Sequence, residues 1–265
     1  MMNFKVKIPP KASNSKIENF FIKKGLKEII NLSKAKSKGV NDMIHLSPYK
    51  PELKDLYNLY NYITLNKRIT ILEFGSGWSS LIFSIALKEL KQKYKSQVLN
   101  LRRNNPFELF ILENDLKFLN ISKKRIKLFK ETKPIKIHYK FSEVVMTTYR
   151  DHISTKYKNF PTCNPDFIYL DGPDQFNIRG NINNFSTRHK DLMPMSCDIL
   201  RIEYFLTPGT IIVCDGRSAN ANFLRNNFKR NWIYNHDKFN DQHIFYLNDK
   251  SLGKYNDLQL KFYKS

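Results

Sequence analysis

The apolar residues of this chain change their spacing near residue 65. Before that point they recur at helical intervals among lysines, first over Ile17–Leu32 and again over Leu53–Ile63. Such spacing predicts amphipathic helices. Two prolines within Ser47–Pro51 interrupt the pattern and separate the two helical stretches. We therefore expect a helical N-terminal extension over residues 1–64.

Beyond residue 65, short apolar runs alternate with amphipathic stretches. Seven runs predict strands, at Ile69–Phe74, Phe107–Leu112, Ile135–Phe141, Phe167–Leu170, Thr210–Cys214, Trp232–Tyr234 and His243–Leu247. Helices are expected at Ser79–Tyr94, Leu116–Phe129, Lys190–Phe205 and Ala219–Phe228. This alternation predicts a doubly wound α/β fold, with a mostly parallel seven-stranded sheet. Because no full helix separates the last two strands, the final strand should run antiparallel to the rest of the sheet. The expected α/β domain covers residues 65–250 and leaves a tail at 251–265.

Composition limits the classes of function without choosing one. The 265 residues carry a formal net charge of +21, which would favour binding to nucleic acid. The basic residues are spread along the whole chain, so general basicity is the favoured interpretation and a nucleic-acid surface stays an alternative. The three cysteines, Cys163, Cys197 and Cys214, have no metal-type or disulfide-framework spacing. With no apolar run long enough to span a membrane and no secretory signal, a cytoplasmic location is expected.

A glycine-containing turn connects the first expected strand to the helix that follows it. The turn, Gly75-Ser76-Gly77, follows Glu73 directly in the strand. Glycines suit such a turn because a ligand approaches the backbone closely and a Cβ would obstruct it. The second strand ends at Glu113, the position where nucleotide-binding α/β folds hold ribose hydroxyls. Asp115, two residues later, is expected to cap the following helix.

These residues resemble the first motifs of the class I S-adenosylmethionine-dependent methyltransferases. The family pattern acid-x-Gly-x-Gly is matched by Glu73, Gly75 and Gly77, and the acid of the second strand is matched by Glu113. The resemblance implies S-adenosylmethionine as cofactor, with Glu73 near its methionine end and Glu113 on its ribose. The residues that it places at the cofactor are Glu73, Gly75, Ser76, Gly77, Trp78, Ser79, Glu113, Ser142, Glu143 and Asp171.

A dinucleotide-dependent oxidoreductase is the main rival interpretation. Its fingerprint requires a third glycine, where this chain has Ser80. Its acidic residue also follows about 20 residues later, whereas Glu113 lies well beyond that distance. Both departures disfavour a nicotinamide cofactor. A binding module without turnover is a further alternative.

Two aspartates follow later strands and should reach the same edge of the sheet. Asp171 ends the fourth strand, and Asp215 ends the fifth. Because parallel strands present their carboxyl ends on one edge, both should face the crevice that holds Glu73 and Glu113. Two carboxylates there could hold a divalent cation such as Mg²⁺. The layout is similar to that of the catechol-type metal-dependent O-methyltransferases, although Gly216 stands where that family has an asparagine.

The Asp-Gly turns also resemble those of bacterial sugar and polysaccharide O-methyltransferases. The resemblance implies transfer of a methyl group to a hydroxyl of a small molecule or of a sugar in glycan biosynthesis. His189 or Lys190 could act as general base without a metal, beside Asp171 and Asp215 as catalytic residues. Arg179, Arg188 and Arg217 could hold an anionic acceptor. A 2′-O or other RNA methyltransferase is the alternative, and a homo-oligomer is compatible with the helical extension.

Overall fold

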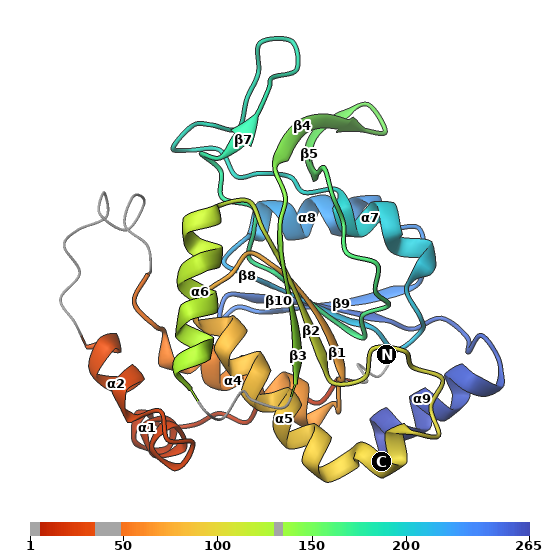
Figure 1. Ribbon diagram of the computed structural model, residues 1–265. Helices are drawn as coiled ribbons and strands as arrows, with labels where there is room; N and C mark the ends of the chain where they lie inside the picture. Colours follow the sequence, from red (N-terminus) through yellow and green to blue (C-terminus); the bar gives the residue numbers. More distant parts are fainter. Residues whose placement is uncertain (1–5, 35–48, 130–134) are drawn as a thin grey trace.

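A computed structural model describes residues 6–34, 49–129 and 135–265 of the chain (Figure 1). Its main sheet has seven strands: β1 (Thr70–Phe74), β2 (Glu108–Glu113), β3 (Lys136–Phe141), β6 (Phe167–Leu170), β8 (Ile211–Asp215), β9 (Trp232–Asp237) and β10 (Gln242–Leu247). The strand order is β3-β2-β1-β6-β8-β10-β9, and β10 runs in the opposite direction to the other six strands. The seven expected strands and the antiparallel one among them are therefore confirmed, and the fold is Rossmann-like.

The central strands are buried on both faces because their sequences are continuously apolar. All five residues of β1 are buried, as are all four of β6. Alternate residues of β1 point to opposite faces, so Ile71 joins one hydrophobic cluster and Leu72 the other. Continuous apolar runs of this kind are typical of parallel strands covered by helices on both sides.

Helices cover both faces of the sheet. The first cluster packs against α1 (Asn14–Lys23), α2 (Lys27–Ser33), α4 (Leu53–Leu65), α5 (Trp78–Val98), α6 (Leu116–Leu128) and α9 (Lys254–Lys264). The second cluster packs against α7 (Asp198–Ile202) and α8 (Ser218–Asn227). Figure 1 shows α7 and α8 on the opposite side of the sheet from α4 and α5. No described helix is long and apolar enough to cross a membrane.

A small second sheet was not expected from the sequence. It consists of β4 (Val144–Tyr149), β5 (His152–Tyr157) and β7 (Ile178–Arg179), in the order β5-β4-β7. The hairpin between β4 and β5 turns at Arg150 and Asp151, whose φ values are +48° and +66°. Tight hairpin turns of this kind usually contain glycine or asparagine, so this pair gave no turn signal. The sheet stands above the carboxyl edge of the main sheet (Figure 1).

Two other expectations need correction. The helix expected at Lys190–Phe205 begins only at Asp198, as α7, and ends in a short 3-10 helix at Glu203–Phe205. Pro194 disfavours a helix in the preceding segment, and residues there bond instead to Thr155 of β5, through Met195 and Cys197. The C-terminal tail also contains a helix, α9, whose Phe262 and Tyr263 are buried in the first cluster. Ser47 and Pro48 of the expected chain break lie outside the described residues.

Candidate functional site

The candidate site lies at the carboxyl ends of β1, β2, β6 and β8. From β1 the chain winds outward through β2 and β3, and then returns to place β6 on the other side of β1. The reversal makes a topological switch point between β1 and β6, where open α/β sheets bind ligands. Glu73, Glu113, Asp171 and Asp215, as expected from the sequence, all stand at this edge of the sheet.

The backbone of the glycine turn passes very close to the turn after β6. Gly75 has a φ of +96°, and a Cβ there would meet the carbonyl carbon of Asp171 at 3.2 Å. Across the contact, a Cβ on Gly172 would lie 2.6 Å from the Gly75 nitrogen. Each position therefore requires glycine, since backbone atoms on the opposite side cannot yield. The contact fixes the glycine turn against the loop that carries Asp171.

Glu73 lies beneath the first turn of α5, with 1% of its surface exposed. Its carboxylate accepts hydrogen bonds from the hydroxyls of Ser79, at 2.5 Å, and Ser80, at 2.7 Å. Burial raises the pKa of Glu73 to about 8, although the two serine hydrogen bonds lower it. Ser80, at the place of the third glycine of a dinucleotide fingerprint, thus serves here as a partner of Glu73.

Glu113 is also buried, with 2% of its surface exposed. One carboxylate oxygen accepts the backbone N–H groups of Asn114 and Asp115, at 2.7 and 2.9 Å, and the other accepts the hydroxyl of Ser76 at 2.7 Å. Burial raises the pKa of Glu113 to about 7, against the lowering effect of these three hydrogen bonds. The hydrogen bond from Ser76 links Glu113 to the glycine turn.

Other residues of the expected cofactor set have structural partners. Trp78 donates its indole N–H to the Tyr49 carbonyl at 2.9 Å, and the Arg125 guanidinium lies 3.6 Å from the centre of its ring. Ser142 is buried, and its backbone N–H donates to the Glu113 carbonyl. Glu143 is half-exposed and forms an ion pair with Lys158 at 2.7 Å. The Lys158 hydrogen bond lowers the pKa of Glu143. The contacts of Trp78, Ser142 and Glu143 with the cofactor stay predictions.

Asp115 behaves as the helix cap that the sequence predicts. Its side chain accepts the backbone N–H groups of Lys117 and Phe118, at 2.7 and 3.1 Å. This hydrogen bonding satisfies the open N-terminus of α6.

Asp171 and Asp215 have different surroundings. The side chain of Asp171 is 54% exposed, and the Arg217 guanidinium lies 3.7 Å from its carboxylate. Desolvation raises the pKa of Asp171, and Arg217 lowers it. Asp215 accepts the hydroxyl of Tyr169 at 3.0 Å. Burial and the charge of Asp171 raise the pKa of Asp215 to about 7.

The N-terminal segment contributes groups that the sequence analysis missed. Burial, followed by the charge of Asp215, raises the pKa of Asp55 in α4 to about 8. Burial and the charges of Asp174 and Asp171 also raise the pKa of Tyr49. Residues 49–55 therefore approach the crevice from outside the sheet. Nothing in their local sequence indicates this approach, because it depends on how α4 packs on α5.

The expected substrate residues lie at the surface. Arg188, His189 and Lys190 are exposed, and the His189 ring accepts the backbone N–H of Asp191 at 3.1 Å. Arg179 is also exposed, 4.0 Å from Glu143. Only Arg217 of the expected arginines has a described contact with an aspartate of the site. The roles of Arg179, Arg188, His189 and Lys190 stay predictions.

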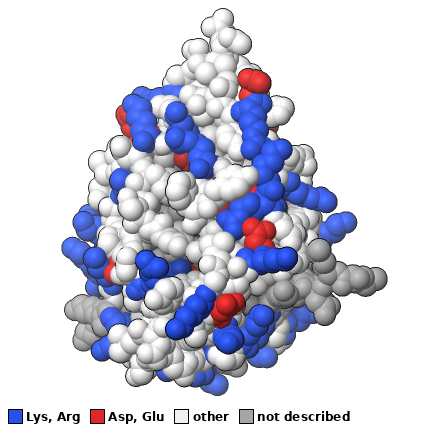
Figure 2. Space-filling model, turned by 90° about the vertical axis from the view of Figure 1, so that its right-hand side faces the viewer, with Lys and Arg blue, Asp and Glu red and all other residues white. Residues whose placement is uncertain are grey.

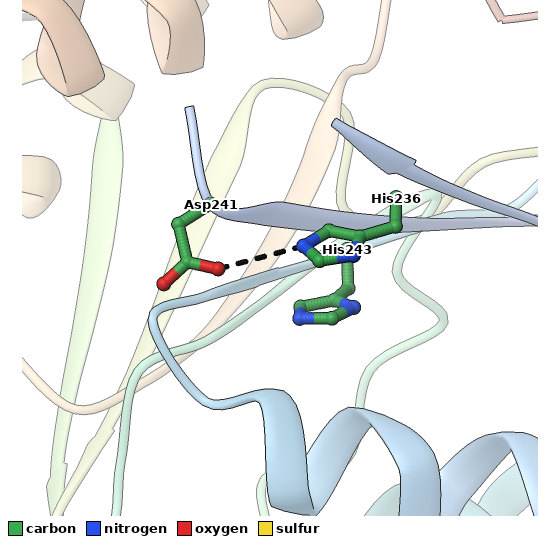
Figure 3. Close-up of side chains that lie close together, drawn as sticks. All are labelled: His236, Asp241 and His243. Carbon is green, nitrogen blue, oxygen red and sulfur yellow. Dashed lines mark hydrogen bonds and ion pairs between the residues drawn. The ribbon is translucent and has the colours of Figure 1, made fainter. Parts of the chain in front are cut away.

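One group of three residues with metal-binding side chains occurs among the described residues, away from Asp171. It consists of His236, Asp241 and His243 at the β9–β10 hairpin (Figure 3). The two imidazole rings stack 3.9 Å apart at 13°, so a single ion cannot lie in both ring planes. Both nitrogens of His243 also have partners, the hydroxyls of Ser218 and Tyr234, each at 2.8 Å. The group is better explained as a polar network that holds the hairpin against α8.

Comparison with known proteins finds similarity at the level of structure only. No known protein-family profile matches the chain, and no curated protein matches its sequence. The Podospora anserina methyltransferase PaMTH1, solved with S-adenosylhomocysteine, is 15% identical, with a TM-score of 0.45 over 91% of this chain and 99% of that one. A Bacillus cereus O-methyltransferase, also solved with S-adenosylhomocysteine, is 12% identical, with a TM-score of 0.41 over 88% and 97%. The Streptomyces achromogenes O-methyltransferase TomG, solved with S-adenosylmethionine, is 12% identical, with a TM-score of 0.38 over 93% of each chain. These values concern the fold, and no site residue is assigned from them.

Proposed function

We propose that this chain is an S-adenosylmethionine-dependent O-methyltransferase. The observation that carries the proposal is the pair of buried carboxyl groups, Glu73 and Glu113, on either side of the glycine turn at the switch point. Within the described residues neither group forms an ion pair with a lysine, arginine or histidine. Buried carboxylates without a basic partner are costly, and a cationic ligand would compensate their charge.

The acidic groups of the crevice distinguish between S-adenosylmethionine and a nicotinamide dinucleotide as the cofactor. A dinucleotide would bring its anionic pyrophosphate to the N-terminus of the first helix after β1. In this chain that place is next to Glu73, with Asp171 on the facing loop, so the phosphates would lie beside acidic groups whose ionised forms repel them. S-adenosylmethionine carries a sulfonium and an ammonium group, and this positive charge would favour the ionised forms of the same groups, which attract it. The electrostatics therefore favour the methyl donor.

The chain's own residues have separable tasks in this proposal. When bound, S-adenosylmethionine supplies a methyl group from its sulfonium sulfur to the acceptor oxygen, and the sulfur leaves as a neutral thioether. Glu113 would accept hydrogen bonds from the ribose hydroxyls. Asp215, with its pKa raised to about 7, would accept the proton of the acceptor hydroxyl. Arg217 holds Asp171, and the pair would orient the acceptor in line with the reacting bond.

Proton transfer to Asp215 is favoured over activation by a metal ion. Arg217 already supplies at Asp171 the positive charge that a divalent cation would supply. In the described part of the chain, no third carboxylate or imidazole joins Asp171 and Asp215 in a group of metal ligands. The acceptor is proposed to be a small hydroxyl compound, with an anionic sugar as the narrower proposal because of Arg217. The RNA alternative gains no specific support: on the face viewed in Figure 2, groups of Lys and Arg are interspersed with Asp, Glu and uncharged residues.

The proposal is tested by calorimetric titration with S-adenosylmethionine, S-adenosylhomocysteine and NAD⁺. We expect saturable binding of the first two compounds and none of NAD⁺. Acceptor screening should follow with added Mg²⁺ and with EDTA, sugars before RNA. Binding of NAD⁺ alone by the folded protein would overturn the proposal in favour of an oxidoreductase.

A further inference from the structure

A second cavity lies at the amino edge of the main sheet, opposite the candidate site. Its volume is about 710 Å³. Its walls are formed by Thr70 at the start of β1, by residues that precede β2, β6 and β8, and by the beginning of α9, namely 102–105, 160–164, Ile202, 205–207, 252–256 and Gln259. This cavity is called the amino-edge pocket below. Ligand sites in proteins generally have volumes of about 300–1,000 Å³, so a small molecule would fit.

Arg103 gives the amino-edge pocket a buried positive charge. Its side chain is only 3% exposed. One guanidinium nitrogen, Nη2, donates to the Asn164 carbonyl at 2.7 Å and lies 3.7 Å from the Asp166 carboxylate. The other, Nη1, is buried without a hydrogen-bond partner among the described residues. Buried donors without acceptors are rare and costly, so an acceptor from a ligand would relieve this one.

The surrounding charges do not balance Arg103. Asp166 already accepts the backbone N–H groups of Ile69 and Thr70 and the hydroxyl of Tyr263. A second guanidinium, Arg68, is 2% exposed and stacks on the Tyr263 ring at 3.9 Å. Its Nε and Nη1 atoms also lack partners in the described part of the chain. Arg103 therefore shares its one described carboxylate partner with three other donors, which leaves positive charge at the wall of the pocket.

The N-terminus of α9 adds donors to the same pocket. Gly253, Lys254, Tyr255 and Asn256 line it, and no side chain caps the helix. The N–H groups of a first helical turn have no intrahelical acceptor, and the helix dipole attracts anions to them. Lys254 adds a further positive charge. The unpartnered Arg103 and the open helix end thus indicate the same kind of ligand group, an anion.

The rim of the pocket is apolar. Phe205, Leu252 and Tyr255 expose 80%, 68% and 52% of their surfaces. The Arg102 guanidinium lies 5.2 Å from the Tyr255 ring. Figure 2 views the side of the molecule that bears α7 and α9, and there Lys and Arg border a broad uncharged surface. An aromatic ring on the ligand could stack on this rim, while its anionic group reached the floor.

We propose that the amino-edge pocket binds a small organic phosphate that carries a planar ring, of about the size of a mononucleotide. The negative charge of a phosphate offsets the positive charges of Arg103 and Lys254, and the exposed aromatic side chains of the rim receive the ring. This site is separate from the crevice at the carboxyl edge. The proposal does not depend on the function assigned to that crevice.

The test uses AMP and phenyl phosphate as probes, with adenosine and inorganic phosphate as the two halves of AMP. In calorimetric titrations of the full chain, we expect at least one of the two ring phosphates to bind more tightly than either half. Saturation with S-adenosylhomocysteine should not change that affinity. Competition with S-adenosylhomocysteine, or dissociation constants above about 10 mM for both ring phosphates, would overturn the proposal. Binding of oligoadenylate without binding of AMP would overturn it in favour of a nucleic-acid surface.

Rim variants test the location without disturbing the buried Arg103. Phe205→Ala and Lys254→Gln should each weaken binding of the ring phosphate by roughly fivefold or more, through lost stacking and lost charge. The matched controls are Tyr204→Ala, an adjacent aromatic residue that is 72% exposed, and Lys261→Gln, an exposed lysine on the last turn of α9. Neither control residue lines the pocket. Equal effects in variants and controls would place the phosphate elsewhere.

Discussion

Replacement of Glu113 by glutamine should weaken cofactor binding and, at the same time, stabilise the protein without ligand. The amide oxygen of the new side chain could keep the backbone N–H groups of Asn114 and Asp115 that Glu113 now accepts. The amide NH₂ group could donate to Ser76, whose hydroxyl can accept as well as donate. The local hydrogen bonding therefore survives, and only the charge is lost.

The effect on stability follows from the pKa of Glu113. Burial raises this pKa to about 7 in the folded protein, from an ordinary value of 4.5. The folded state therefore binds the proton more tightly, and the free energy of unfolding falls as the pH rises from about 4.5 to about 7. The full cost, which is present above pH 7, is at most about 3 kcal/mol. Glu113→Gln should recover part of that cost at pH 8 and little of it at pH 4.5.

The effect on binding has the opposite sign. A hydrogen bond to a charged group contributes about 1.5–3 kcal/mol, so losing the charged acceptor for the ribose should weaken binding by about 10- to 150-fold. Denaturant unfolding at pH 4.5 and pH 8 gives the stability, and calorimetry with S-adenosylhomocysteine gives the affinity. A residue that only supports the fold would not produce both changes together.

Asp198→Asn is the matched control for Glu113→Gln. Asp198 is buried, and burial raises its pKa to about 7 as well. It accepts the Tyr157 backbone N–H at 3.2 Å and the Ser196 hydroxyl at 3.0 Å, and has no hydrogen bond with the glycine turn among the described residues. We expect this variant to change the pH dependence of stability and to leave cofactor affinity within about twofold. If Glu113→Gln binds S-adenosylhomocysteine as tightly as the wild type does, the ribose assignment is wrong.

Three further perturbations address the rest of the site. Asp215→Asn should reduce methyl transfer at least 100-fold, roughly the contribution of a general base, with unchanged cofactor affinity. In the wild type, kcat should rise about tenfold per pH unit up to about pH 7 and then level off, because the base must be deprotonated and its pKa is about 7. A flat pH profile of kcat from pH 5 to 8 would exclude Asp215 as the general base. Arg217→Gln should raise the pKa of Asp171 and increase KM for the acceptor more than it lowers kcat, which steady-state kinetics would show; an unchanged KM would contradict its orienting role. Gly172→Ala should lower stability by about 1–3 kcal/mol in denaturant unfolding, because its Cβ would lie 2.6 Å from the Gly75 nitrogen; wild-type stability would show that the two turns can separate.

The sequence predicted the parts of the fold whose signal is local. Continuous apolar runs located β1, β6 and β8, since strands buried on both faces leave that pattern. The β4–β5 hairpin escaped prediction because its strands mix polar and apolar residues and its turn, Arg150-Asp151, lacks glycine or asparagine. The region before α7 is not helical because Pro194 disfavours a helix there and neighbouring residues bond to Thr155 of β5.

The candidate site divides in the same way. The positions of Glu73, Glu113, Asp171 and Asp215 at one edge followed from the rule that parallel strands end together. The pairing of Arg217 with Asp171 and the approach of Asp55 to Asp215 did not follow, because they depend on tertiary packing between distant segments. The chemistry of His189 and Lys190 can be recognised in the sequence, whereas their exposure at the surface cannot.

The two edges of the sheet carry opposite unbalanced charges. At the carboxyl edge, Glu73 and Glu113 are buried without basic partners among the described residues, and at the amino edge the buried side chains of Arg68 and Arg103 have guanidinium nitrogens without hydrogen-bond partners in that same part of the chain. Both arrangements cost folding free energy, and ligands of opposite charge would offset each cost. The five residues of β1 separate the edges by about 16 Å, over which two unit charges interact by about 1 kcal/mol at an effective dielectric constant of 20. The cofactor and the phosphate should therefore change each other's affinity by less than about fivefold, and a larger coupling would require a change in the sheet or its helices.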